Sequence, residues 1–183
     1  MGIITALVIL ILLAFTYIGI YNGFIKTRNQ VDESWAQIDV QLKRRCDLIP
    51  NLLETVKGYA RHEQETLTKV IEARNRLMNA DNTQQEQIAA NNQLSGALHS
   101  IFALGESYPE LKANTLFIEL QHELSTTENK VAYSRQLYNS TVMVWNTKTE
   151  TFPSNFIAGF HHFTRREMLK IEESVREVPK IQF

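Results

Sequence analysis

The sequence predicts an all-α protein in which one N-terminal transmembrane helix precedes an elongated, antiparallel, up-and-down bundle of about four helices. Three observations support this prediction. All 19 Lys and Arg and all 20 Asp and Glu follow residue 25, so the first 25 residues carry no charged side chain. Residues 26–183 hold only four Gly and four Pro. Their apolar residues recur at three- and four-residue steps, which is the period of an amphipathic helix.

The transmembrane anchor is expected within residues 1–25. The run from Ile3 to Tyr21 is interrupted by only two polar residues, Thr5 and Thr16. A helix of about 20 apolar residues spans a hydrocarbon core of about 30 Å. A cleaved signal peptide is disfavoured, because that reading requires a basic start, a shorter apolar run and a small-x-small cleavage site.

The charges that follow the anchor predict its orientation. Cations lie just after the span and a little further on, at Lys26, Arg28, Lys43, Arg44 and Arg45. The positive-inside rule then places the N-terminus outside and residues 26–183 in the cytoplasm, as in a single-pass inner-membrane protein. The lone Cys46 is consistent with a reducing compartment.

Two glycines in the anchor have the GxxxG spacing. Gly19 and Gly23 are four residues apart, which lets two transmembrane helices pack closely. The alternative is that both glycines simply face lipid.

The first two bundle helices are expected on either side of Pro50. An apolar stripe continues from the anchor to about Leu48, and Pro50 then interrupts it. Asn51 with Glu54 resembles an N-cap pair that opens a second helix, which would end near Ala80. The chain either reverses at Pro50 or only bends there.

Two further helices follow. Thr83 and Glu86 have capping-box spacing and open a third helix that ends near Gly105. The fourth helix, 115–150, has the longest apolar stripe, formed by Leu116, Leu120, Leu124, Thr127, Val131, Ser134, Tyr138, Val142 and Trp145. Pro153 ends it. We therefore expect a bundle over residues 26–153 and a Phe-rich segment with a C-terminal tail over 154–183, whose last residues are either a short helix or extended.

Four ordered blocks of this sequence resemble the LemA family of bacterial membrane proteins. They are Trp35 to Leu52 with Glu54 to Ala60, then Tyr108 to Asn114, Arg135 to Asn139 and Phe152 to Ala158. The resemblance covers essentially the whole chain. It implies a single N-terminal transmembrane helix carrying an up-and-down helical bundle. It implies no enzymatic activity. Genes of the family are often found near those of HtpX-type membrane zinc metalloproteases. His161 and His162 depart from the glycine and apolar residues of relatives.

Five polar residues around Pro50 form a possible interaction cluster: Arg44, Arg45, Asp47, Asn51 and Lys57. The competing interpretation is that Asp47 and Asn51 cap helix ends while the cations pair or snorkel across the bundle. The second interpretation is favoured, because capping requires these residue types.

No pattern indicates catalysis or a metal site. His62-Glu63 and His122-Glu123 lack a second His at helical spacing, and there is only one thiol. Cys46 is expected to be buried beside the apolar stripe. We therefore expect no catalytic residue, cofactor, metal or small-molecule substrate, and the net charge of −1 argues against nucleic acid as a partner.

Residues 152–163 hold four of the nine phenylalanines. In an alternating bundle the fourth helix returns toward the membrane, so Phe156, Ile157, Phe160 and Phe163 are hypothesised to dock on the bilayer interface or on a neighbouring protomer. The alternative is that they close the open end of the bundle.

Together these features predict a membrane-anchored, non-enzymatic scaffold that contacts lipid and self-associates at the cytoplasmic face. The alternative is an adaptor or regulator of a membrane enzyme such as an HtpX-type metalloprotease.

Overall fold

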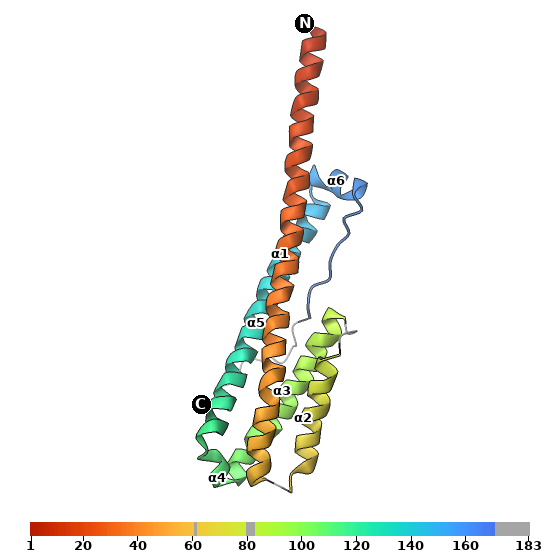
Figure 1. Ribbon diagram of the computed structural model, residues 1–183. Coiled ribbons are helices and arrows are strands. Elements are labelled where there is room, and N and C mark those ends of the chain that lie inside the picture. Colours follow the sequence, from red (N-terminus) through yellow and green to blue (C-terminus); the bar gives the residue numbers. More distant parts are fainter. Residues whose placement is uncertain (61, 80–82, 171–183) are drawn as a thin grey trace, which may run out of the picture. The chain divides into compact units, whose positions relative to one another are not determined.

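The computed structural model describes residues 1–60, 62–79 and 83–170, and every regular element in them is an α-helix (Figure 1). The alternatives for the C-terminal tail after residue 170 fall outside the described residues. The helices in chain order are α1 (Gly2–Tyr59), α2 (Gln64–Leu77), α3 (Gln84–Ser107), α4 (Pro109–Lys112), α5 (Thr115–Glu150) and α6 (Ser154–Phe160).

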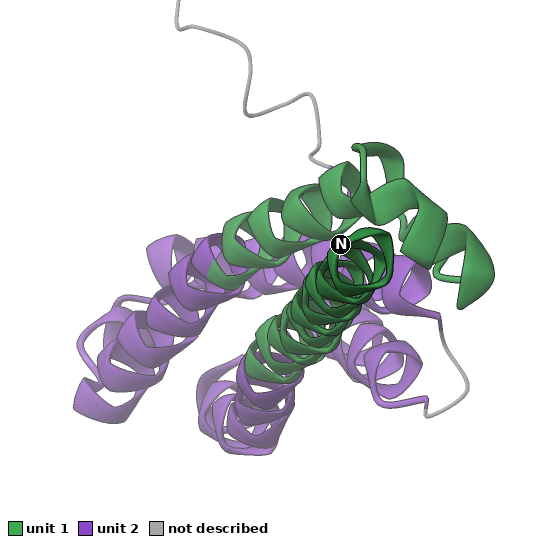
Figure 2. Ribbon diagram, turned by 90° about the horizontal axis from the view of Figure 1, so that it is seen from above, with its two compact units in different colours: residues 1–37, 134–168 green, residues 38–133, 169–183 purple. Residues whose placement is uncertain are grey.

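The predicted fold class, an anchor helix followed by an antiparallel helical bundle, is confirmed. The helices form two compact units, each discontinuous in sequence (Figure 2). Unit 1 comprises residues 1–37 and 134–168, and the described residues of unit 2 lie within 38–133 and at 169–170. The helices α1 and α5 each contribute one part to either unit.

Unit 2 is an up-and-down bundle. The second half of α1 and α3 run one way, while α2 and the first half of α5 run the other (Figure 1). Its core is aliphatic and draws on all four of these helices, with Ile38, Ile49, Leu52, Val56, Val70, Leu94, Leu98, Ile101 and Leu124 among the buried side chains. Burial of this apolar area is the main favourable contribution to folding of the unit.

The expectation that the first helix ends near Leu48 is wrong, because α1 continues through Pro50 to Tyr59. Proline lacks the N–H that would bond to the carbonyl four residues earlier, which here belongs to Cys46. The Nε atom of Arg74 donates to that carbonyl at 2.9 Å. An arginine from α2 thus supplies the hydrogen bond that Pro50 withholds, and the chain does not reverse at Pro50.

The expected cap at Asn51 is wrong for the same reason. Asn51 and Asp47 are exposed residues in the interior of α1. The second helix begins instead at Gln64, with Glu63 as its N-cap residue.

The later helix starts agree with the predictions. Thr83 and Glu86 form a capping box, in which the Thr83 Oγ1 accepts from the Glu86 N–H and the Glu86 carboxylate accepts from the Thr83 N–H. These bonds lower the pKa of Glu86. Pro109 occupies the first turn of the short helix α4. On α5, however, Leu116 of the predicted stripe is exposed and Phe117 is buried in its place.

Unit 1 joins the first part of α1 to the second part of α5. Ser34 and Thr141 share a hydrogen bond at 2.9 Å, and the rings of Trp35 and Tyr138 meet edge to face at 5.8 Å. Between these contacts and the apolar segment lies buried Phe24.

The N-terminal part of α1 is long and apolar enough to cross a membrane. Its best 18-residue window has a mean hydropathy of 2.8, and none of that window is buried in the protein. Large apolar side chains from Ile3 to Ile18 are exposed to their surroundings, as expected of a helix covered by lipid.

We expect Arg74→Met to lower the free energy of unfolding by about 2 kcal/mol, since the Cys46 carbonyl loses its side-chain donor. The loss in free energy of unfolding caused by R74M should be smaller when the chain also carries P50A, because the backbone N–H restored at position 50 supplies that hydrogen bond. Reversible unfolding of the full chain in mixed micelles, followed by circular dichroism, measures both values.

The matched control is Arg76→Met, which removes an exposed arginine of the same helix. Equal costs of R74M with and without P50A would contradict this account of Pro50.

Candidate functional site

The Phe-rich segment folds back onto the base of the apolar helix within unit 1. After α5 ends at Glu150, a cis Phe152-Pro153 peptide bond precedes α6. The Ser154 hydroxyl lies 2.7 Å from the Lys148 carbonyl and 2.8 Å from the Thr151 carbonyl, so it ties the start of α6 to the end of α5. Ile157 and Ala158 are buried on the inner side of α6.

An aromatic cluster links α1, α5 and the residues after α6. We define it as Tyr17, Tyr21, Phe24, Trp145, His161 and Phe163. The Phe163 ring lies 5.0 Å from Phe24 and 5.5 Å from Trp145, centroid to centroid. The His161 Nε2 lies 2.7 Å from the Tyr17 hydroxyl, and its ring is 4.7 Å from Tyr21. Offset and edge-to-face ring pairs of this kind add to the stability gained by burial alone.

The chain after the cluster is fastened to α5. Trp145 Nε1 donates to the Thr164 carbonyl at 2.8 Å. The Asn146 side chain donates to the Arg166 carbonyl and accepts from the Arg166 N–H, both at 2.9 Å. The Arg166 guanidinium lies over the Trp145 ring and reaches Asp32 at 2.6 Å. Residues 164–166 are therefore held by three kinds of contact.

Lys148 holds the end of α5 against α1. Its Nζ donates to the Gly23 carbonyl at 2.9 Å and to the Thr27 hydroxyl at 2.6 Å. Burial lowers the pKa of this ammonium. A Cβ placed on Gly23 would contact the Lys148 ammonium, whereas one on Gly19 would meet nothing. Of the two anchor glycines, Gly23 thus has a neighbour within its own chain.

The four predicted residues of the Phe-rich segment divide into two pairs. Ile157 is buried and Phe163 joins the aromatic cluster, so this pair closes the end of unit 1. Phe156 and Phe160 point outward, as does Phe152, with exposed fractions of 70, 75 and 79%. We call these three the outer phenylalanines. The i, i+4 spacing of Phe156 and Phe160 places them on one side of α6. Sequence reasoning missed Phe152, which precedes the helix and joins them through its ring contact with Phe156.

The predicted polar cluster around Pro50 divides as well. Arg45 is only 1% exposed, and it donates to Asn91 Oδ1 at 2.8 Å and to Glu128 Oε2 at 3.2 Å. Burial lowers the pKa of its guanidinium, and Glu128 opposes that shift. Arg45 is thus a core residue that ties α1 to α3 and α5 inside unit 2.

The other four members of that cluster lie at the surface. Arg44 pairs with Glu123 at 2.7 Å, with both side chains well exposed. Asp47, Asn51 and Lys57 are exposed positions of α1. These four residues therefore form a polar surface on α1, and Arg45 is not part of it because it is buried.

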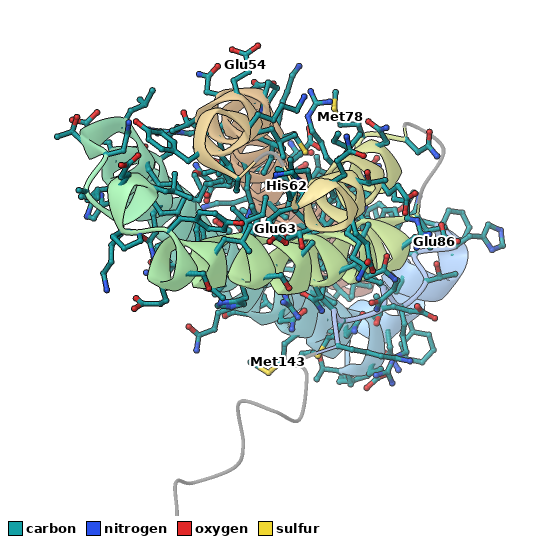
Figure 3. All side chains as sticks on the ribbon, turned by 90° about the horizontal axis from the view of Figure 1, so that it is seen from below. Glu54, His62, Glu63, Met78, Glu86 and Met143 are labelled. Carbon is teal, nitrogen blue, oxygen red and sulfur yellow. The ribbon has the colours of Figure 1, made fainter. Side chains whose placement is uncertain are left out.

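Polar side chains also join the helices at the end of unit 2 where α1 ends and α4 and α5 begin. Glu63 is half-buried and accepts from the Tyr108 hydroxyl at 3.2 Å, and Asn114 donates to the Tyr59 hydroxyl at 3.0 Å. Figure 3 shows this end: Glu54 points away from the bundle, whereas Glu63 lies among the helices. These bonds join the chain after α1 to the start of α4, and Tyr59 itself to the start of α5.

Within the described ranges, no group of three or more His, Cys, Asp or Glu side chains is placed to hold a metal ion. Cys46 is buried, as expected, and burial raises the pKa of its thiol. A shallow groove between α2 and α3 is lined by side chains of both charges, including Lys69, Glu72 and Arg76.

Comparison with known proteins identifies the family to which the sequence is similar. The model of the LemA family matches residues 34–183. The chain is 29% identical over 147 residues to Protein LemA of Metamycoplasma hominis, an alignment that covers 79% of this chain and 66% of that protein. It is 21% identical over 186 residues to the proteins Magnetosome protein MamQ 1 and MamQ 2 of Paramagnetospirillum magneticum, covering 88% of this chain and 68% of each. The chain thus spans about two thirds of the length of these relatives.

Adjacent arginines on α1 give a direct test of the Arg45 assignment. We expect Arg45→Met to lower the free energy of unfolding by about 3 kcal/mol, because it leaves the buried Asn91 oxygen without its donor. Arg44→Met breaks an exposed ion pair and should cost less than about 1 kcal/mol. Chemical unfolding measures the loss in free energy of unfolding for both variants. Equal losses would show that Arg45 contributes no more to stability than an exposed arginine.

Proposed function

Because this chain belongs to the LemA family, we propose that it is a membrane-anchored, non-enzymatic scaffold that organises proteins at the cytoplasmic face of the bacterial inner membrane. It does so by self-association of its long helices. The family and the apolar N-terminal helix together indicate a membrane-anchored helical protein; the scaffold role, the orientation and the assembly are the proposal.

The observation that carries the proposal is the continuity of α1. One helix of 58 residues contains both the apolar segment and the buried stripe from Ile38 to Val56. The same helix therefore joins the membrane to the bundle without an intervening linker. This arrangement suits a protein that presents a folded surface next to the bilayer.

The charges after the apolar segment support the cytoplasmic placement. Lys26 and Arg28 are both exposed and lie within the first turn after residue 25. Cations at this position favour retention on the cytoplasmic side.

The outward side of α5 supports self-association. Ile118, Tyr133, Met143 and Val144 are all exposed. At about 100° per residue they fall within one arc of the helix. The residues between them on that arc include Ser125, Asn129, Gln136 and Ser140. An exposed strip of large apolar and small polar side chains along a long helix fits a second helix of the same kind.

The buried polar groups support a non-enzymatic role. Arg45 is held by Asn91 and Glu128, and Arg74 is held by the Cys46 carbonyl. The bonds that these two guanidinium groups make hold the helices of unit 2 together, although the buried Nε of Arg45 has no hydrogen-bond partner among the described residues.

The test is the mass of the full-length protein in mild detergent, by light scattering. We expect a discrete oligomer. Met143→Asp places a charge in the strip on α5 and should reduce the mass. Met78→Asp is the matched control, because Met78 is 52% and Met143 is 54% exposed, and Figure 3 shows both side chains at the surface.

A protein that is strictly monomeric at micromolar concentration would contradict self-association. If such a monomer co-purified with a membrane protease, the adaptor function would replace the scaffold. An oligomer that M143D and M78D leave equally intact would show that the strip on α5 is not the contact.

A further inference from the structure

We propose that α6 and the turn before it form an interfacial membrane segment, whose outer phenylalanines Phe152, Phe156 and Phe160 insert into the boundary between headgroups and acyl chains of the leaflet from which α1 emerges. The partner is the lipid bilayer itself. The inference uses the anchor of the proposed function but is independent of self-association.

The segment that carries the outer phenylalanines has one exposed and one buried side. The outer phenylalanines are each at least 70% exposed, whereas Ile157 and Ala158 are buried against unit 1. Two of the outer rings are also close to one another, since Phe152 and Phe156 meet edge to face at 6.0 Å. Three exposed aromatic rings on one side of a short segment make a patch that water solvates poorly.

The position of α6 along the anchor follows from ring contacts and a hydrogen bond. Contacts within unit 1 link the residues just after α6 to the end of the apolar segment: His161 to Tyr17 and Tyr21, and Phe163 to Phe24. Tyr17 to Phe24 are the last two turns of that segment. The end of α6 therefore lies beside the part of α1 that is expected to leave the membrane.

The surroundings of the outer phenylalanines favour lipid as their partner. The exposed apolar side chains of α1, up to Ile18, require lipid around them, and α6 lies next to where that region ends. Residues 152–163 carry no Lys, Arg, Asp or Glu. Aromatic rings with nearby polar tips, as Tyr17 and His161 provide, are typical of the membrane interface. Exposed Lys26 and Arg28 add attraction to anionic headgroups.

The experiment measures the depth of single nitroxide labels in full-length protein reconstituted into vesicles of phosphatidylethanolamine and phosphatidylglycerol. Labels replace Phe156 or Phe160 one at a time, so that the other outer phenylalanines remain. Leu10→Cys, in the apolar segment, is the control for lipid. Met78→Cys, an exposed apolar position of unit 2, is the control for water. Cys46 is replaced by Ala in every variant, and circular dichroism verifies folding.

Oxygen concentrates in acyl chains and a charged nickel chelate stays in water, so the ratio of their collision rates reports depth. We expect this ratio at positions 156 and 160 to exceed that at position 78 by about fivefold or more, and to lie below the value at position 10, because an interfacial segment is shallower than the middle of the anchor.

Two results would overturn the proposal. A ratio at 156 and 160 equal to that at 78 would place α6 in water. Labels shielded from both probes, with dipolar broadening between copies, would show that a second copy of this chain covers the patch. A label at position 10 that is exposed to water would show that the apolar segment is not in the membrane, and would overturn both this inference and the membrane attachment. Loss of oligomers alone would contradict self-association and leave the depth at positions 156 and 160 unchanged.

Discussion

The carbonyl of Cys46 is the point on which the arrangement of unit 2 depends. Pro50 cannot donate to it, and an unsatisfied buried carbonyl inside a helix would favour a break there. The guanidinium of Arg74 supplies the missing hydrogen bond from α2. Because that bond satisfies the carbonyl, α1 remains a single helix, and the stripe from Ile38 to Val56 stays in phase with the core.

The two units use different chemistry around the same helix. In unit 2, buried or half-buried cations bridge helices: Arg45 joins α1 to α3 and α5, and Arg74 joins α2 to α1. Such bonds are directional, so they favour one register of helices over others that an aliphatic core alone would tolerate. In unit 1 the corresponding contacts between helices are made by aromatic rings around Phe24 and Trp145.

Much of this fold could be predicted from the sequence. Charge distribution and apolar periodicity indicate the anchor and the helices, and the capping box at Thr83 and the proline at 109 mark two helix starts correctly. The error at Pro50 has a physical cause: local rules treat proline as a break, and the compensating donor lies 28 residues from the carbonyl that it satisfies. The division of the predicted site residues into buried and exposed members likewise depends on packing that the spacing alone does not determine.

A distance between two spin labels tests most directly whether α1 is continuous across Pro50. Lys43 and Lys57 are exposed residues of α1 on either side of the proline. In one helix they are separated along the axis by about 21 Å, at 1.5 Å per residue. Pulsed electron paramagnetic resonance on the full chain, with cysteines at these two positions and Cys46 replaced, should give a single narrow distribution consistent with that rise. Packed antiparallel helices are about 10 Å apart. A distribution centred at that distance would mean that the chain reverses at Pro50, and would contradict a continuous α1.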